Sequence, residues 1–259
     1  MQMFDSHMML TIVGIALVGG LIGLDRTAVG QFMISQPIVV GPLTGWILGD
    51  PGAGAVIGAV LELIWVLDMP IGSFVPADAT ISTVSATAIA ALGSPGGSSL
   101  PVIGFSILLT VAMVPVTMMA DDIIRHRNSR LADALVTGPG PDPRRELARA
   151  QLSGLLVFFL KSFILCLVFL PAGVAAVSAF NHMPERIHRA MSLFVKLLPL
   201  VGAALVVRKL SMGMVDLFFL SGFMIAALAG LLFHAPAHII ILLTVTGGWL
   251  GARYRERRS

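Results

Sequence analysis

Long apolar segments recur along the chain, and polar residues gather between them. The apolar runs cover residues 8–24, 101–120, 152–180, 191–207, 214–233 and 236–250. A helix needs roughly 20 apolar residues to cross the hydrocarbon of a bilayer, and about 17 suffice at the short end. Several runs reach that length, so the pattern predicts an all-α integral membrane protein, a polytopic helix bundle.

Residues 30–80 depart from this pattern because prolines interrupt the apolar sequence. The interrupting residues are Pro37, Pro42, Pro51, Pro70 and Pro76. Irregular backbone at membrane depth is tolerated only where protein buries it or where it lines a cavity. Short apolar segments broken by Gly or Pro indicate the binding site in secondary transporters. The N-terminal half is therefore predicted to contain broken or re-entrant helices.

Glycines in and near this segment recur at four-residue spacing. The groups are Gly19 and Gly23, then Gly41, Gly45 and Gly49, then Gly54 and Gly58. At that spacing a helix presents a smooth stripe along which another backbone can approach closely. We expect these helices to pack against protein, and we favour packing within the chain over a contact between subunits.

The composition excludes an ordinary soluble domain. Mean hydropathy is +0.92 and 12% of residues are charged, whereas a soluble domain carries about 25%. The sequence pI near 9.6 reflects basic loops, which report orientation in the membrane and not binding to nucleic acid. The single cysteine, Cys166, lies among Leu and Phe and is expected to be a packed core thiol.

Arginines gather in two segments. Residues 121–150 contain six and residues 253–259 contain four. Because basic segments stay in the cytoplasm, both are predicted to lie on the cytoplasmic side of the membrane. The crossings between them are predicted at 152–177, 191–207, 214–233 and 236–252. One membrane domain results, with these parts: a site-bearing half at 1–120, a cytoplasmic basic loop at 121–150, a four-helix half at 151–252 and a cytoplasmic tail at 253–259.

The middle of the basic loop alternates proline and glycine. Pro139, Pro141 and Pro143 alternate with Gly138 and Gly140, a pattern that breaks helices. We interpret the loop as a connector, in preference to a docking surface for a soluble partner.

Five carboxylates stand in the interrupted segment with little basic charge to match them. They are Asp25, Asp50, Glu62, Asp68 and Asp78. Arg26 is the one basic residue among them, and the next along the chain is Arg125. Ionisable groups at membrane depth are expensive and mark substrate or ion paths. These acids are therefore predicted to bind sugar hydroxyls, protons, cations or groups on a partner chain.

Glu62 and Trp65 are three residues apart in a run without helix breakers, so they project from neighbouring parts of one helix face. A carboxylate accepts hydrogen bonds from sugar hydroxyls, and an indole ring covers the apolar face of a sugar. The alternative is an interfacial tryptophan, with Glu62 bonded to a nearby backbone amide. Gln31 and Gln36 add uncharged donors and acceptors in the same region.

The other acids have structural interpretations beside the functional one. Asp50 precedes a proline and Asp78 precedes an apolar run, so both are candidate helix N-caps. Asp25 and Arg26 can end the first helix as a neighbouring ion pair. Asp68 and Asp78 flank a Pro- and Gly-containing stretch that suits a loop entering a cavity.

Lys161 lies within the apolar run that begins at residue 152. It can pair with a lone acid across the bundle, but we favour a side chain that snorkels to the cytoplasmic surface. His234 and His238 have metal-ligand spacing, yet Pro236 between them argues against a zinc-protease motif. No metal or cofactor is expected.

Residues 23–91 contain ordered motifs that resemble a known family. The motifs are Gly23-Leu-Asp25-Arg26, Gln31-Phe-Met-Ile-Ser35-Gln-Pro37, Val40-Gly-Pro-Leu-Thr-Gly45, Leu48-Gly-Asp50-Pro51, Gly58-Ala-Val-Leu-Glu62-Leu-Ile-Trp65 and Pro70-Ile-Gly-Ser-Phe-Val-Pro76-Ala-Asp78. They resemble the IIC membrane subunit of the mannose/fructose/sorbose family of the bacterial phosphotransferase system. Two departures stand out: Gln36 replaces a common Arg, and Ala77 replaces a Pro.

The resemblance implies a sugar permease subunit that pairs with a IID membrane subunit in a trimer of IIC–IID pairs. Cytoplasmic IIA and IIB subunits would carry the phosphate, so no phosphorylated or catalytic residue is expected in this chain. We predict that it carries a hexose across the inner membrane for phosphorylation by these partners. Gln31, Glu62, Trp65, Asp68 and Asp78 are the predicted sugar contacts. The secondary candidates are Asp25, Gln36, Asp50 and Lys161.

Two other functions are compatible with the same residues. An ion- or proton-coupled carrier would use the acids to bind its coupling cation. A scaffold or sensor without transport would assemble with IID but move no sugar, and the replacement at Gln36 is its sequence hint.

Overall fold

The computed structural model describes residues 5–65, 68, 75–94, 96–137 and 142–210. The chain divides into two compact units, Met1–Gly202 and Ala203–Ser259, and the first contains the candidate site. The crossings predicted at 214–233 and 236–252 and the tail at 253–259 lie outside the described residues.

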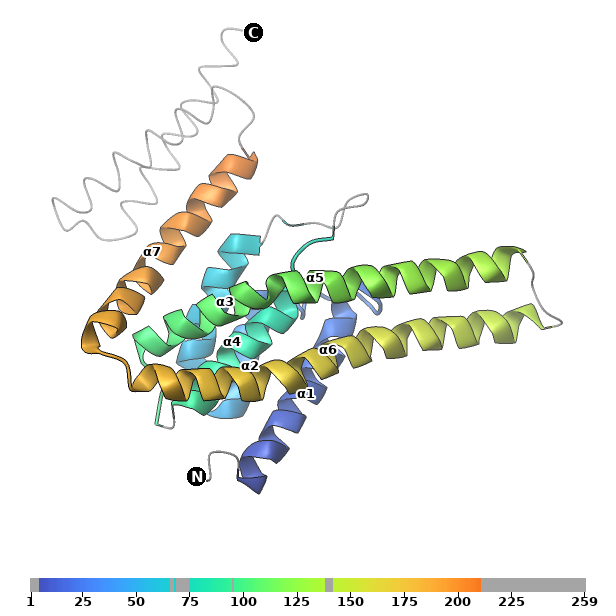
Figure 1. Ribbon diagram of the computed structural model, residues 1–259. Helices are drawn as coiled ribbons and strands as arrows, with labels where there is room; N and C mark the ends of the chain where they lie inside the picture. The colour runs from blue at the N-terminus through green and yellow to red at the C-terminus, as the bar shows by residue number, and fades with distance from the viewer. Residues whose placement is uncertain (1–4, 66–67, 69–74, 95, 138–141, 211–259) are drawn as a thin grey trace, which may run out of the picture. The chain divides into compact units, whose positions relative to one another are not determined.

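Every regular element in the described residues is an α-helix (Figure 1). The helices are α1 (Ser6–Thr27), α2 (Pro37–Leu48), α3 (Pro51–Trp65), α4 (Ala79–Gly93), α5 (Leu100–Thr137), α6 (Pro143–Asn181) and α7 (Glu185–Leu210). Of these, α1, α5, α6 and α7 are long and apolar enough to cross a membrane. The prediction of an all-α polytopic membrane protein is confirmed.

The interrupted segment forms two short helices, as the prolines predict. Helices α2 and α3 have 12 and 15 residues, about 18 and 22 Å at 1.5 Å per residue, which is shorter than the roughly 30 Å hydrocarbon core. Pro37 and Pro51 each begin a helix, where the missing N–H costs nothing. Gly49 ends α2 with φ +82°, a conformation that favours glycine.

Glycines let α2 and α3 approach backbone to backbone. A Cβ on Gly41 would lie 2.8 Å from the Cα of Gly58, and one on Gly54 would lie 3.1 Å from the Cα of Gly45. The predicted packing of this glycine stripe within the chain is confirmed. It fixes α3, which carries Glu62 and Trp65, against α2.

Helix α4 lies at the centre of the first unit. Every residue of 80–90 is buried, and α4 contacts α1, α2, α3, α5 and α6. Small and hydroxyl-bearing side chains such as Ser82, Thr83 and Ser85 allow this close packing on all sides. The beginning of α4 is therefore a point at which polar groups from several helices can meet.

Helices α5 and α6 pack side by side in opposite directions (Figure 1). The segment 121–150, predicted to be a loop, is mostly helical, because α5 continues to Thr137 and α6 begins at Pro143. The alternating prolines and glycines at 138–141 lie outside the described residues. A helix can leave an apolar environment without unwinding, so a cytoplasmic location for this basic segment does not require irregular backbone.

Candidate functional site

The segment 28–36 between α1 and α2 is irregular and is held by one carboxylate. Asp25 Oδ1 accepts a hydrogen bond from the Phe32 amide at 2.6 Å, and its Oδ2 accepts one from the Ser35 amide at 3.0 Å. Gln31 and Met33 both have positive φ, at 53° and 64°, which is uncommon outside glycine. The predicted ion pair between Asp25 and Arg26 is wrong: Asp25 is buried and organises this segment.

Gln36 and Glu62 lie together where this segment meets α2 and α3. With its amide nitrogen turned toward the carboxylate, Gln36 donates to both Glu62 oxygens at 3.1 and 3.3 Å. The Ile38 amide also donates to Glu62, at 3.2 Å, as the structural alternative anticipated. Both side chains are half-buried. Two residues that are 26 positions apart thus form one polar pair.

Trp65 ends α3 on the same helix as Glu62 and is half-buried. The Asp68 amide donates to the Trp65 carbonyl at 2.9 Å. Asp68 is also half-buried, and residues 69–74 beyond it lie outside the described part of the chain. Gln31 is exposed in the 28–36 segment.

Asp78 lies at the start of α4 in a buried network of charges. Its Oδ1 accepts from the Ile81 amide at 3.1 Å and faces Arg26 Nη1 at 3.2 Å. Its Oδ2 lies 2.6 Å from Lys161 Nζ, which also lies 2.6 Å from Asp121 Oδ1. The side chains of Asp78, Lys161 and Asp121 are only 3–8% exposed.

This geometry contradicts the preference for a snorkelling Lys161. The lysine is held by two carboxylates inside the protein, an arrangement that offsets part of the cost of burying charge. Asp121 was missed because it directly follows the apolar run 101–120 and was counted with the basic loop. The signal available was its position: it stands within the continuous helix α5, not beyond its end.

Asp50 is an N-cap, as predicted. Its Oδ1 accepts from the Ala53 amide at 3.1 Å, and its Oδ2 accepts from the Ser98 amide at 2.7 Å. The carboxylate therefore joins the start of α3 to the segment before α5. Asp25, Asp50 and Asp78 thus all bind donors of the chain itself.

These contacts separate two groups of candidates. Asp78 is 2% exposed and is therefore closed to a ligand, whereas Glu62, whose oxygens also accept hydrogen bonds, is only half-buried. Gln36, Glu62, Trp65 and Asp68 are half-buried and Gln31 is exposed. The second group stays accessible to a ligand, because none of its members is fully buried.

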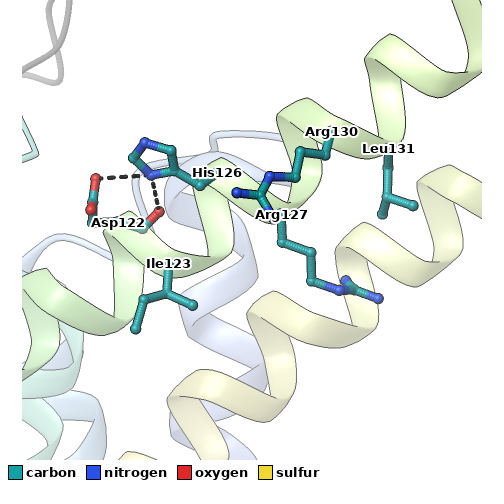
Figure 2. Close-up of a pocket in the computed structure, with 6 residues that line it drawn as sticks. All are labelled: Asp122, Ile123, His126, Arg127, Arg130 and Leu131. Atoms are coloured by element: carbon teal, nitrogen blue, oxygen red, sulfur yellow. Dashed lines mark hydrogen bonds and ion pairs between the residues drawn. The ribbon is translucent and has the colours of Figure 1, made fainter.

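A separate surface cavity of about 550 Å³ lies on α5. Figure 2 shows its lining side chains, among them Asp122, His126, Arg127 and Arg130. His126 Nδ1 lies 3.3 Å from Asp122 Oδ1 and 2.9 Å from the Asp122 carbonyl. None of the predicted site residues lines this cavity.

Among the described residues, no group of three His, Cys, Asp or Glu is placed to hold a metal ion. His234 and His238 lie outside the described part of the chain. Cys166 is fully buried, as predicted for a core thiol.

Short glycine-packed helices beside long apolar ones, with polar pairs at their breaks, define a polytopic helical membrane protein. Comparison with known proteins identifies the family. The family model described as "PTS system sorbose-specific iic component" matches residues 9–246. The chain belongs to this family, the IIC sugar permeases of the phosphotransferase system of mannose, fructose and sorbose type.

Curated relatives match most of the chain at low identity. The mannose-specific EIIC component of Escherichia coli K12 is 24% identical over 220 residues, which cover 84% of this chain and 80% of that protein. The fructose permease IIC component of Bacillus subtilis is 23% identical over 226 residues, with 84% and 79% covered.

Two solved structures share the fold. One, described as "Structure of membrane protein", has a TM-score of 0.70 at 20% identity. The other, the complex of the mannose transporter ManYZ with microcin E492, has a TM-score of 0.52 at 21% identity. Both alignments cover 98% of this chain and 96% of the other.

Proposed function

We propose that this chain is the sugar-translocating subunit of a phosphoenolpyruvate-dependent phosphotransferase system. It carries a hexose of the mannose, fructose, sorbose or hexosamine type across the bacterial inner membrane, and a cytoplasmic partner phosphorylates the sugar. Membership of the IIC family supports this function. The relatives named for mannose and fructose support a hexose as the substrate class.

The observation that carries the proposal is the half-buried pair of Gln36 and Glu62. Glu62 offers carboxylate oxygens to sugar hydroxyls, and Gln36 can both donate and accept. Trp65, one turn along α3, supplies a ring for the apolar face of the sugar. Gln31 and Asp68 are proposed as further hydroxyl contacts.

The contacts of Asp78 change its proposed role. The sequence suggested a direct sugar contact, but its oxygens bind Arg26, Lys161 and the Ile81 amide. We therefore propose that Asp78 acts on the site indirectly. The same applies to Asp25 and Asp50, which hold backbone amides.

The proposed partners are a IID membrane subunit and the cytoplasmic IIA and IIB phosphocarriers, in a trimer of IIC–IID pairs. No residue of this chain is proposed to carry phosphate, and no cofactor is required of it. The arginine-rich distal ends of α5 and α6 are proposed to face the cytoplasm, by positive-inside reasoning.

The test is phosphoenolpyruvate-dependent phosphorylation of labelled hexoses by membranes that contain this chain and its candidate IID partner, together with the soluble phosphocarriers. Mannose, fructose, sorbose and N-acetylated hexosamines are compared. The expected result is phosphorylation of at least one sugar, abolished when this chain is omitted.

Absence of phosphorylation by the assembled complex would refute group translocation. Uptake that an uncoupler abolishes and that ignores phosphoenolpyruvate would then identify an ion-coupled carrier. Assembly without any flux would identify a scaffold.

A further inference from the structure

Four charged side chains from four helical regions form one alternating chain of charges. Arg26 ends α1, Asp78 caps α4, Lys161 lies within α6 and Asp121 lies within α5. The order of contacts is Arg26, Asp78, Lys161, Asp121, at 3.2, 2.6 and 2.6 Å. Two cations alternate with two anions, so the set is formally neutral.

The neutrality matters because the side chains of Asp78, Lys161 and Asp121 are only 3–8% exposed and that of Arg26 is 19% exposed. Removing one member of a buried ion pair leaves an uncompensated charge, whereas replacing both partners with uncharged residues is often tolerated. Lys161 and Asp121 form the last pair of this chain of charges, and their side chains are 6% and 8% exposed. Through Asp78, they connect the N-terminal end of α4 to the long helices α5 and α6.

The outer end of the charge chain reaches the segment that carries Gln31 and Gln36. Arg26 is adjacent to Asp25, which binds the Phe32 and Ser35 amides. The Thr80 hydroxyl, in the first turn of α4, donates to the Ser35 carbonyl at 2.9 Å. The 28–36 segment is therefore held from the end of α1 and from the start of α4.

We propose that Lys161 and Asp121 are positioning residues for sugar binding. They fix the start of α4 against α5 and α6, and α4 with Arg26 and Asp25 then fixes the segment that presents Gln31 and Gln36 to the sugar. This inference rests on the proposed function of that segment. The pair itself touches no sugar.

The main variant is the double replacement Lys161→Met with Asp121→Asn, which removes the contacts of Lys161 with Asp121 and with Asp78 and leaves Asp78 paired with Arg26. Lys161→Arg retains a cation that can bridge both acids and is the rescue variant. Lys196→Met is the matched control, because Lys196 is an exposed lysine on α7. The amount of assembled complex in the membrane is measured for each.

The first readout compares two quantities: the KM for the hexose substrate and the maximal rate of its phosphorylation per assembled complex. We expect the double variant to raise KM by about tenfold or more, because small displacements of binding groups have large effects. The maximal rate per complex should change little, since phosphoryl transfer belongs to the partners. Lys161→Arg should keep most of the wild-type affinity for the sugar, and Lys196→Met should have the same KM as the wild type.

The second readout is hydrogen exchange of the Phe32 and Ser35 amides in the complex. Exchange should quicken by about tenfold in the double variant, because a looser clamp opens more often. Exchange of amides in α7 should not change.

Unchanged KM and unchanged exchange would overturn the proposal. So would a smaller amount of complex with both values unchanged, because the pair would then act only in assembly. If the wild type phosphorylates no hexose, the proposed function fails instead. Hydrogen exchange then decides alone whether the pair positions the 28–36 segment.

Discussion

Replacing Gly54 with alanine tests whether α2 and α3 are held together by backbone contact. A Cβ at this position would meet the carbonyl group of Gly41, with the carbonyl carbon at 2.8 Å, and the Cα of Gly45 at 3.1 Å. All of these atoms belong to the backbone of α2. No side-chain rotation can make room, so the helices must move apart.

The size of the effect follows from two opposing terms. Overpacking costs about 1–3 kcal/mol, and the rigid backbone here places the cost near about 3 kcal/mol. Alanine regains about 0.5–1 kcal/mol over glycine within a helix. The net loss is about 2 kcal/mol, which corresponds to roughly 4–8 °C in Tm for a chain of this size.

Gly52→Ala is the matched control on the same helix. Its Cβ would meet only Asp50 Oδ1, at 3.9 Å, so the helix gain should appear without the clash. The assay is thermal unfolding of the detergent-solubilised complex, followed by retention of the intact species on size-exclusion chromatography. Equal Tm values for Gly54→Ala and Gly52→Ala would refute the close-packing argument.

Three further variants test the other polar contacts. Glu62→Gln should lower uptake by about tenfold, the scale of one charge-assisted hydrogen bond, with unchanged amounts of complex; normal uptake would remove Glu62 from the site. Asp25→Ala should leave the Phe32 and Ser35 amides without this acceptor, so a non-specific protease should cleave the 28–36 segment faster. An unchanged cleavage rate would show that Asp25 does not hold the segment in place. Asp50→Ala should lower Tm through the loss of a cap worth about 1–2 kcal/mol, and an unchanged Tm would show that the cap contributes nothing.

Features set by local sequence were predictable. Pro37 and Pro51 indicated where α2 and α3 begin, and the glycine spacing indicated that the two helices pack closely. The caps at Asp50 and Asp78 followed from the residues that succeed them. Each of these features depends on contacts within a turn or within one hairpin, which is the range that sequence spacing describes.

The pairing of Lys161 with Asp78 spans 83 positions, and the spacing of charges alone does not determine it. Such a pair depends on the axial register of α1, α4, α5 and α6, which small residues set. A Cβ on Gly19 would meet Cys166, and one on Gly23 would meet Ser162, so α1 and α6 run antiparallel in a defined register. Extending that register places Arg26 within one turn of Lys161. A half-buried cation and a buried one at the same level are stabilised by an anion between them, and Asp78 supplies it. Asp78 therefore has two basic partners, Arg26 and Lys161, and the second is contributed by α6.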